Sequence, residues 1–468
     1  MIGSRERLDQ SGVMSDVINK SWMILAFFAV IVALAGGASR FDAIQIVPLR
    51  SLSAFFLVSS LFYLTRQGLR AERTLIILFT CLTLLVLLQL VPLPPALWQD
   101  LPGRTEIAQM DAALGFEAFW RPLSLAPMRS WNVLGSLVVP AAGLLLAIAS
   151  GVSSLTLLRI IAGLGVLNAL LGLLQIVSGE SGIFYFYEIT NRGSSVGFFA
   201  NENHAAVFAA CSMLVLALLN SKIRESRRAQ WERLIYPGAF FLIFFVSLAG
   251  NSRAGFVAAV GAVLASSAML ALTQRTRRGL PSANVTRRWF DEHPRLVLAV
   301  PLVIVLLTVA AFLALDRTPA ARDILARDSF EDLRWSLWPV IVEMLEHHWV
   351  LGAGFGSFEQ VYHIYEPSSL LLPRYVNQAH NDWAQFIIEG GVLACLLLIG
   401  LLIWMASAIG TMSLHRTRRV DAIFWMTIFA IIAAASIVDY PLRTPLFQVI
   451  TIWLLVALSK DARDMKAT

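Results

Sequence analysis

Four arginines and one histidine draw attention because each lies in a polar segment between long apolar stretches. The arginines are Arg192, Arg253, Arg334 and Arg443, and the histidine is His380. A guanidinium group is planar, stays charged when partly buried and can bind a phosphate through two parallel hydrogen bonds. An imidazole titrates near neutral pH, so it can take a proton from a hydroxyl group. Brought together, these side chains would form a polyanion site beside a general base.

Each of these residues also has an ordinary explanation. Arginine is the main basic residue throughout the chain, so a general preference for arginine explains the set equally well. A histidine at a membrane boundary is often only an interfacial polar residue. Polar groups at a membrane edge are costly unless they face a cavity, so four arginines arriving beside one histidine favour a site.

Two further patterns do not indicate a bound metal or nucleotide. His347 and His348 are adjacent and cannot share one helix face, so with Glu346 we interpret them as a solvated surface. The glycines at 352, 354 and 356 follow no expected strand, and we interpret them as a flexible turn or a close helix contact. We therefore expect no metal and no cofactor.

The composition identifies the elements that must position these side chains. The chain has 468 residues, of which 57% are hydrophobic and 15% charged, and its mean hydropathy is +0.69. Soluble domains carry roughly 25% charged residues, so a soluble globular protein is excluded. Cys81, Cys211 and Cys395 lie within apolar runs, which excludes a disulfide framework and a cysteine-based metal site.

Membrane-spanning helices are therefore expected, each about 20 mostly apolar residues long. We predict an all-α polytopic membrane protein with about twelve transmembrane helices, the first of which is retained rather than cleaved as a signal peptide. The expected spans are 21–37, 44–64, 74–91, 131–150, 155–178, 203–219, 232–249, 253–272, 296–315, 383–408, 421–438 and 444–459.

The basic residues predict the orientation of these spans. With the N-terminus in the cytoplasm, 23 of the 37 lysines and arginines lie on the inner side and 12 on the outer side. All four lysines are among the inner residues. Because cytoplasmic loops carry an excess of positive charge, we predict that both termini are cytoplasmic. The same bias accounts for the net charge of +6, so we expect no nucleic-acid partner.

The predicted layout has five parts. Residues 1–20 form a cytoplasmic tail, 21–315 hold helices 1–9 with a periplasmic interfacial segment at 92–130, and 316–382 form a large periplasmic loop domain between helices 9 and 10. Residues 383–459 hold helices 10–12, and 460–468 form a second cytoplasmic tail.

The segment at 92–130 contains a short helical pattern and three nearby tryptophans, Trp98, Trp120 and Trp131. It fits a helix in the outer leaflet with tryptophan anchors, or equally a loop helix packed on the bundle.

The chain resembles the bacterial O-antigen ligase and O-antigen polymerase family of membrane glycosyltransferases. The resemblance covers roughly residues 190–445 and rests on an ordered set of short motifs. They are Arg192 with Gly197-Phe-Phe-Ala-Asn201-Glu-Asn203-His204, Asn251-Ser252-Arg253-Ala254-Gly255, Arg334-Trp335 with Leu351-Gly-Ala-Gly354-Phe-Gly356-Ser-Phe358, Ala379-His380-Asn381-Asp382-Trp-Ala-Gln385 with Glu389-Gly390, and Val438-Asp439-Tyr440-Pro441-Leu-Arg443. Ala254 departs from the family, which commonly has glycine there.

The resemblance implies a fold like that of the type C membrane glycosyltransferases and a location in the bacterial inner membrane. It implies transfer of a glycan from undecaprenyl diphosphate at the periplasmic face, without a metal, to an acceptor saccharide such as lipid A core or a growing polysaccharide. We expect Arg192 and Arg253 to bind the diphosphate and His380 to act as general base. Arg334 and Arg443, with Asn381 and Asn203, are expected to support the site.

Ligation to the acceptor is the first expectation, and chain polymerisation is a close alternative. A transporter of lipid-linked glycan is the rival outside enzymology, although transporters place polar sites at the midplane and often repeat one half of the chain. Here Arg50, Arg159 and Glu389 are the main charged residues expected inside spans, and no internal repeat is visible.

Overall fold

The computed structural model of the chain describes residues 21–223, 227–250, 252–277, 299, 302–303, 305–310, 329–371 and 376–466. The expected tail at 1–20, most of the ninth span and the first part of the loop domain lie outside these residues.

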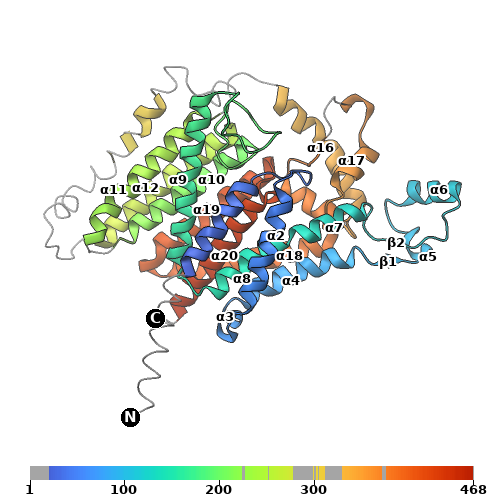
Figure 1. The fold of residues 1–468 in the computed structure, drawn as a ribbon, viewed down its shortest axis with the longest axis horizontal. Coiled ribbons are helices and arrows are strands. Elements are labelled where there is room, and N and C mark those ends of the chain that lie inside the picture. The colour runs from blue at the N-terminus through green and yellow to red at the C-terminus, as the bar shows by residue number, and fades with distance from the viewer. Residues whose placement is uncertain are drawn as a thin grey trace, which may run out of the picture.

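The described residues are largely helical (Figure 1). The first helix, Ser21–Ala35, is short and apolar. It is followed by α2 (Ile46–Leu61), α3 (Arg66–Ala71), α4 (Arg73–Leu88), α5 (Pro95–Trp98), α6 (Thr105–Leu114), α7 (Pro127–Ser136), α8 (Val138–Ala149), α9 (Ser154–Ser178), α10 (Glu202–Ser221), α11 (Arg227–Leu248), α12 (Arg253–Arg277), α16 (Ser329–His348), α17 (Phe358–Tyr365), η1 (Ser368–Leu370), α18 (Asp382–Leu414), η2 (Arg416–Arg418), α19 (Arg419–Val438), η3 (Pro441–Arg443) and α20 (Pro445–Lys466).

Eight helical segments of the described chain are long and apolar enough to cross a membrane. They start at Pro127, Ser154, Glu202, Trp231, Arg253, Asp382, Arg416 and Pro445. Three shorter apolar helices, Ser21–Ala35, α2 and α4, match the first three expected spans. The prediction of an all-α polytopic membrane protein is therefore confirmed.

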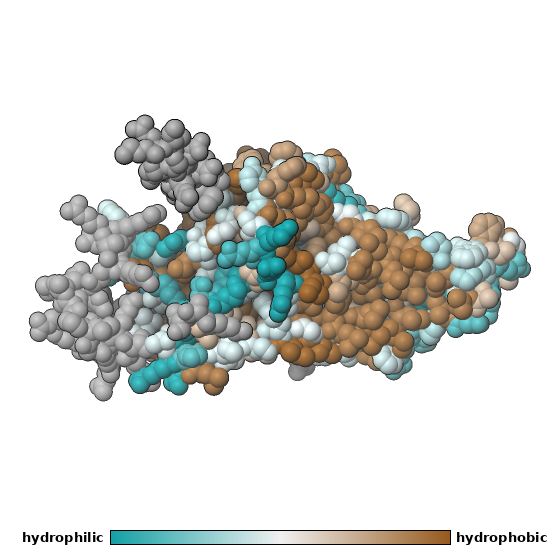
Figure 2. All heavy atoms as spheres, turned by 90° about the horizontal axis from the view of Figure 1, so that it is seen from below, coloured by the Kyte–Doolittle hydropathy of each residue, from teal (hydrophilic) through white to brown (hydrophobic). Residues whose placement is uncertain are grey.

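The surface of the bundle is apolar where lipid would contact it. Phe27, Val47 and Phe55 are exposed by more than 60%, and Leu88 and Ile403 by 58% and 62%. Figure 2 shows a broad apolar area over the centre and right of one face, with hydrophilic side chains gathered in its left half. Such continuous apolar exposure is normal for a surface that faces lipid tails and unusual for one that faces water.

Helix α10 is the centre of the bundle. It packs against α9, α11, α12 and α19 (Figure 1), and its side chains from Phe208 to Leu216 are almost all buried. This helix matters for the site because its N-terminus lies at the end of the bundle that carries His380, which we call the His380 end.

A two-stranded hairpin starts an arm between α4 and α7. Strands β1 (Pro92–Leu93) and β2 (Arg121–Pro122) pair in antiparallel register, with Pro92 opposite Pro122. The arm carries α5 and α6, and Figure 1 shows α6 apart from the bundle. This placement argues against a loop helix packed on the bundle.

The prediction that Trp98 anchors this arm in the membrane is wrong. Trp98 is only 3% exposed, and its indole N–H donates to the carbonyl of Pro122 at 2.8 Å. The side chain therefore packs inside the arm because its polar edge has a partner there. Trp120 and Trp131 are more than half exposed.

Helices α16 and α17 form a lobe over the start of α18. Leu337, Ile341 and Met344 of α16 share a buried cluster with Tyr362 of α17 and Ile388 of α18. This cluster fixes the polar segment before α18, which contains His380, against the lobe.

The glycine-rich turn after α16 docks on a kink in α18. The kink lies at Gly391, whose φ is +66°, and the broken helix leaves carbonyls free. Ala353 N–H donates to Ile388 O at 2.8 Å and Gly354 N–H to Glu389 O at 2.9 Å. A Cβ on Gly352 would lie 2.4 Å from Glu389 O, so only glycine fits. This close contact, rather than a nucleotide, explains the glycine run.

Candidate active site

His380 occupies a strained turn immediately before α18. Its φ of +50° is the only positive value for a non-glycine residue within the described part of the chain. This conformation costs an L-residue roughly 1–2 kcal/mol. Asn381 caps the helix, since its Oδ1 accepts from the N–H of Ala384 at 3.0 Å. Asn381 thus supports the turn by capping, and the cap together with the lobe holds His380 in place.

The imidazole of His380 faces a buried carboxylate. Its Nδ1 lies 3.7 Å from Oδ1 of Asp439, and its ring meets the ring of Tyr440 edge to face at 4.9 Å. Asp439 is the C-cap of α19 and is 3% exposed. The N–H of Tyr440 donates to Asp439 Oδ1 at 2.9 Å, which fixes the orientation of the carboxylate. His380 and Asp439 are therefore within ion-pair distance, so the carboxylate can interact with a positive charge on the imidazole.

A second histidine shares this carboxylate. Nε2 of His204, in the first turn of α10, also lies 3.7 Å from Asp439 Oδ1. Its side chain is 1% exposed, whereas that of His380 is 19% exposed. Asn203 completes the surroundings by donating to Asp439 Oδ2 at 2.7 Å. Only His380 of these two histidines can meet a substrate from outside the protein.

The electrostatics of this cluster favour an ionised aspartate. Burial would raise the pKa of Asp439, but the neighbouring imidazoles of His204 and His380 lower it well below its usual range. A carboxylate that stays ionised stabilises a positive charge that develops on an adjacent imidazole. The site can therefore support proton uptake by His380.

Arg192 and Arg253 lie near the same end of α10. Arg192 is exposed, donates to the carbonyl of Glu180 at 3.1 Å and lies 5.3 Å from the ring of Tyr185. Arg253 is the first residue of α12 and is partly buried. A Cβ built on Gly250 would lie 3.2 Å from Ser195 Oγ, so the two arginine-bearing turns touch.

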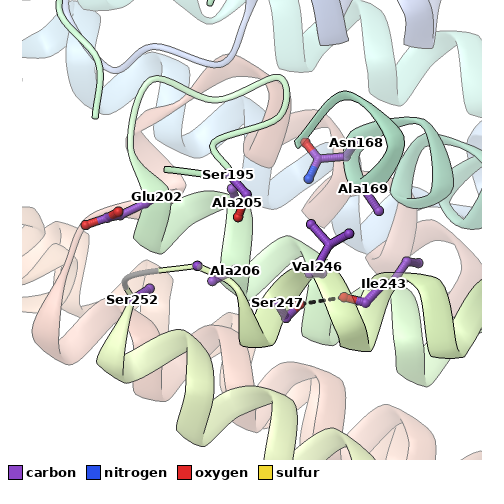
Figure 3. Close-up of a pocket in the computed structure, with 12 residues that line it drawn as sticks. Asn168, Ala169, Ser195, Glu202, Ala205, Ala206, Ile243, Val246, Ser247 and Ser252 are labelled. Carbon is purple, nitrogen blue, oxygen red and sulfur yellow. Dashed lines mark hydrogen bonds between the residues drawn. The ribbon is translucent and has the colours of Figure 1, made fainter. Parts of the chain in front are cut away.

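These turns surround a small cavity of about 20 Å³ (Figure 3). Asn168, Ser195, Ser247 and Ser252 contribute polar groups to its wall, and Figure 3 shows the Glu202 carboxylate directed away from the other lining side chains. A cavity of this size holds about one water molecule. It is therefore too small to be a substrate pocket.

Short contacts connect the arginine turns with the histidine cluster. The N–H of Glu202 donates to Asn191 Oδ1 at 3.2 Å, next to Arg192. Asn201, the N-cap of α10, lies 3.5 Å from Asp439 through its Nδ2. The N-terminus of α10 therefore contacts both the turn that carries Arg192 and the carboxylate of Asp439. It brings the arginine turns and the His380–Asp439 pair to one region.

The two other arginines expected at the site, Arg443 and Arg334, differ from Arg192 and Arg253. Nη1 of Arg443 donates to Glu389 Oε2 at 2.8 Å, and its Nε lies 3.4 Å from Asp382 Oδ1. Its charge is therefore balanced inside the protein. Arg334 lies in α16, but its side chain is outside the described residues.

The expected solvated surface at the end of α16 is wrong for one residue. His348 is 1% exposed, and its Nε2 lies 3.1 Å from the hydroxyl of Tyr365. The wall beside it includes Gly103, on which a Cβ would lie 2.6 Å from the His348 ring. Within the described ranges, no three His, Cys, Asp or Glu residues are grouped to hold a metal ion.

Sequence reasoning missed the partner of His380. Asp439 and His204 both lie within the family-like motifs of the sequence. They are 59 and 176 positions away from His380, so their spacing gives no sign that they contact it. The signal that could have found Asp439 is its position as an acidic residue directly after an apolar span, on the side where His380 precedes one.

Comparison with known proteins agrees with the motifs. Residues 238–399 match the family model described as O-antigen ligase. The resemblance to the O-antigen ligase and polymerase family is confirmed. The matched range is about a third of the chain and includes Arg253 and His380, whereas Arg192, Asp439 and Arg443 lie outside it. A search of curated proteins finds no match. The O-antigen ligase match implies a glycosyltransferase-like membrane enzyme that acts on lipid-linked glycan.

Proposed function

We propose that the chain transfers a glycan from undecaprenyl diphosphate to an acceptor hydroxyl at the periplasmic face of the bacterial inner membrane, in lipopolysaccharide or surface polysaccharide biosynthesis. The observation that carries this proposal is the accessible imidazole of His380 beside the buried carboxylate of Asp439. A base–carboxylate pair at the end of a membrane bundle suits a hydroxyl acceptor and a donor held in lipid.

His380 is the proposed general base. As the acceptor oxygen attacks the anomeric carbon, its proton passes to His380 and the bond between that carbon and the diphosphate breaks. The electron pair of that bond leaves with the diphosphate. Attack from the face opposite the leaving group inverts the anomeric centre. Asp439 orients the imidazole and stabilises its positive charge.

Arg192 and Arg253 are the proposed diphosphate ligands. The leaving group gains negative charge as the bond breaks, and fixed guanidinium groups can stabilise that charge without a metal ion. Support comes from the contact between the two turns that carry these arginines, and from the polar N-terminus of α10 beside them. Asn203 serves the base by holding Asp439 rather than by binding donor.

The proposed orientation places the His380 end in the periplasm. Ion pairs such as Arg463 with Glu72 and Lys222 with Asp421 lie at the opposite end of the bundle, which is where the excess of basic residues is expected. A cysteine reporter at exposed Ser369 of η1 should label from the periplasmic side. Labelling of this position from the cytoplasm alone would contradict the orientation.

The acceptor can be tested in a deletion strain. If the chain is a ligase, a gel of surface polysaccharide shows lipid A core without any long chains. A single repeat unit on lipid A core instead means that the enzyme is a polymerase. Transport is separated from both in sealed vesicles, because an enzyme transfers glycan on one side whereas a transporter moves the intact donor across.

A further inference from the structure

The proposed chemistry depends on two segments that are distant in sequence. His380 precedes α18, whereas Asp439 follows α19, and each lies in a short irregular turn. A base and its orienting carboxylate lose efficiency when their separation changes by even about 1 Å. Some contact must therefore fix one turn relative to the other.

On the His380 side, the fixing contact is Gln385. Its Oε1 accepts from the N–H of Ala379 at 2.9 Å, directly before His380. Its Nε2 donates to Gln378 Oε1 at 2.7 Å and to Glu389 Oε1 at 3.0 Å. The turn that carries His380 is thereby tied to Glu389, one helical turn further along α18.

On the Asp439 side, the fixing contact is Arg443. Its Nη1 donates to the other carboxylate oxygen of Glu389 at 2.8 Å. Arg443 also contacts Asp382, whose Oδ2 accepts from the N–H of Leu442 and from Ser436 Oγ, both at 3.1 Å. The turn after Asp439 is thus tied to the same glutamate.

Glu389 is suited to be this shared anchor. It is 0% exposed, so water does not compete for either oxygen. Its backbone carbonyl accepts from Gly354 N–H at 2.9 Å and from Gln89 Nε2 at 2.8 Å, which fixes the residue itself beside the α18 kink. An ionisable residue within a membrane span is rarely retained without a function.

We propose that Glu389 is a positioning residue for the transfer reaction, which holds His380 and Asp439 at their working separation through Gln385 and Arg443. It does not contact the substrate. This inference rests on the proposed function, and it gives the supporting role expected of Arg443 a definite form, as part of the same positioning network.

The first test is Glu389→Gln in reconstituted protein. This variant should lower kcat about 10- to 100-fold, with donor affinity and acceptor KM within about two-fold of the wild type. The matched control is Glu72→Gln, which alters another buried glutamate paired with an arginine, at the opposite end of the bundle. The control should keep the wild-type kcat per folded molecule even if its stability falls.

The second test combines Glu389→Gln with Asp439→Asn. If Glu389 acts through the His380–Asp439 pair, the double variant should be little slower than Asp439→Asn alone. Independent losses that multiply would overturn the inference, as would a wild-type kcat in Glu389→Gln while Asp439→Asn is impaired. A wild-type rate in Asp439→Asn would instead overturn the proposed function.

A further variant covers failure of Glu389→Gln to fold. Gln385→Met breaks the link to Ala379 without removing a charge, and it should lower kcat in the same way. A kcat equal to that of the wild type in this variant would count against the inference.

Discussion

Nδ1 of His380 lies 3.7 Å from Oδ1 of Asp439, although the two residues precede and follow different helices. The same Asp439 oxygen is equally distant from the buried His204. One carboxylate therefore serves two imidazoles, of which one is accessible. This relationship leads to the first prediction, on the role of the carboxylate.

Asp439→Asn should lower the transfer rate about 10²-fold or more, because the variant cannot stabilise positive charge on His380. The measurement is the rate of transfer at equal membrane abundance. An unchanged rate would remove Asp439 from the mechanism.

Arg253→Lys should lose most of the transfer activity, on the order of ten-fold or more, although the charge is kept. A lysine offers a point charge instead of a planar pair of donors. Arg159→Lys is the control, since Arg159 is 52% exposed and 3.9 Å from Glu232. Steady-state kinetics with varied donor would check this. Full activity in Arg253→Lys would mean that this position contributes only its positive charge and does not bind the diphosphate through two parallel hydrogen bonds.

The backbone of His380 predicts a trade between stability and activity. Its φ of +50° suits glycine but strains alanine, so His380→Gly should be more stable than His380→Ala by about 1 kcal/mol. Both variants should transfer glycan about 10²- to 10⁴-fold more slowly than the wild type. Thermal unfolding of the two purified variants measures the difference, and equal stability would mean that the turn relaxes.

Acid should loosen the lobe through His348. Burial, together with the charges of Arg104 and His347, lowers the pKa of His348 to about 4. Between the ordinary value of about 6.5 and this value, the unfolded chain binds more protons than the folded chain. The contribution of His348 is therefore complete above about pH 6.5 and is lost as the pH falls toward 4, on the order of 3 kcal/mol.

His348→Gln tests this effect. The variant should lose less thermal stability between pH 7 and pH 4.5 than the wild type does. His363→Gln is the matched control, because His363 is 48% exposed and should not alter the acid response. If His348→Gln is as acid-sensitive as the wild type, another group is responsible.

Hydropathy was sufficient to predict the helical bundle, but not the partners of the polar residues within it. The stretch at 383–408 was recognisable as a span because it is long and apolar, and α18 is found there. The kink at Gly391 was not predictable, because it depends on a glycine turn that docks from residues 352–354. The pattern of apolar residues along the chain indicates which local segments are buried, but it gives no information on a contact between distant segments.

The candidate site shows the same limit. His380 could be singled out because it stands at the start of a span. Its contact with Asp439 depends on the start of α18 lying beside the end of α19, which is a matter of tertiary packing. Arg443 was expected to support the site, but its buried partners Glu389 and Asp382 are determined by tertiary packing. Likewise, His348 is buried because the arm that carries Gly103 packs against it.

The most direct measurement of the central claim is transfer and donor binding in His380→Ala, determined separately on reconstituted protein. The donor is undecaprenyl-diphosphate-linked glycan in vesicles, and His363→Ala is the control. The account predicts that His380→Ala loses about 10²- to 10⁴-fold in rate while its donor affinity stays within about two-fold. A variant that transfers at near the wild-type rate, or that fails only because it no longer binds donor, would contradict the assignment of His380 as the base.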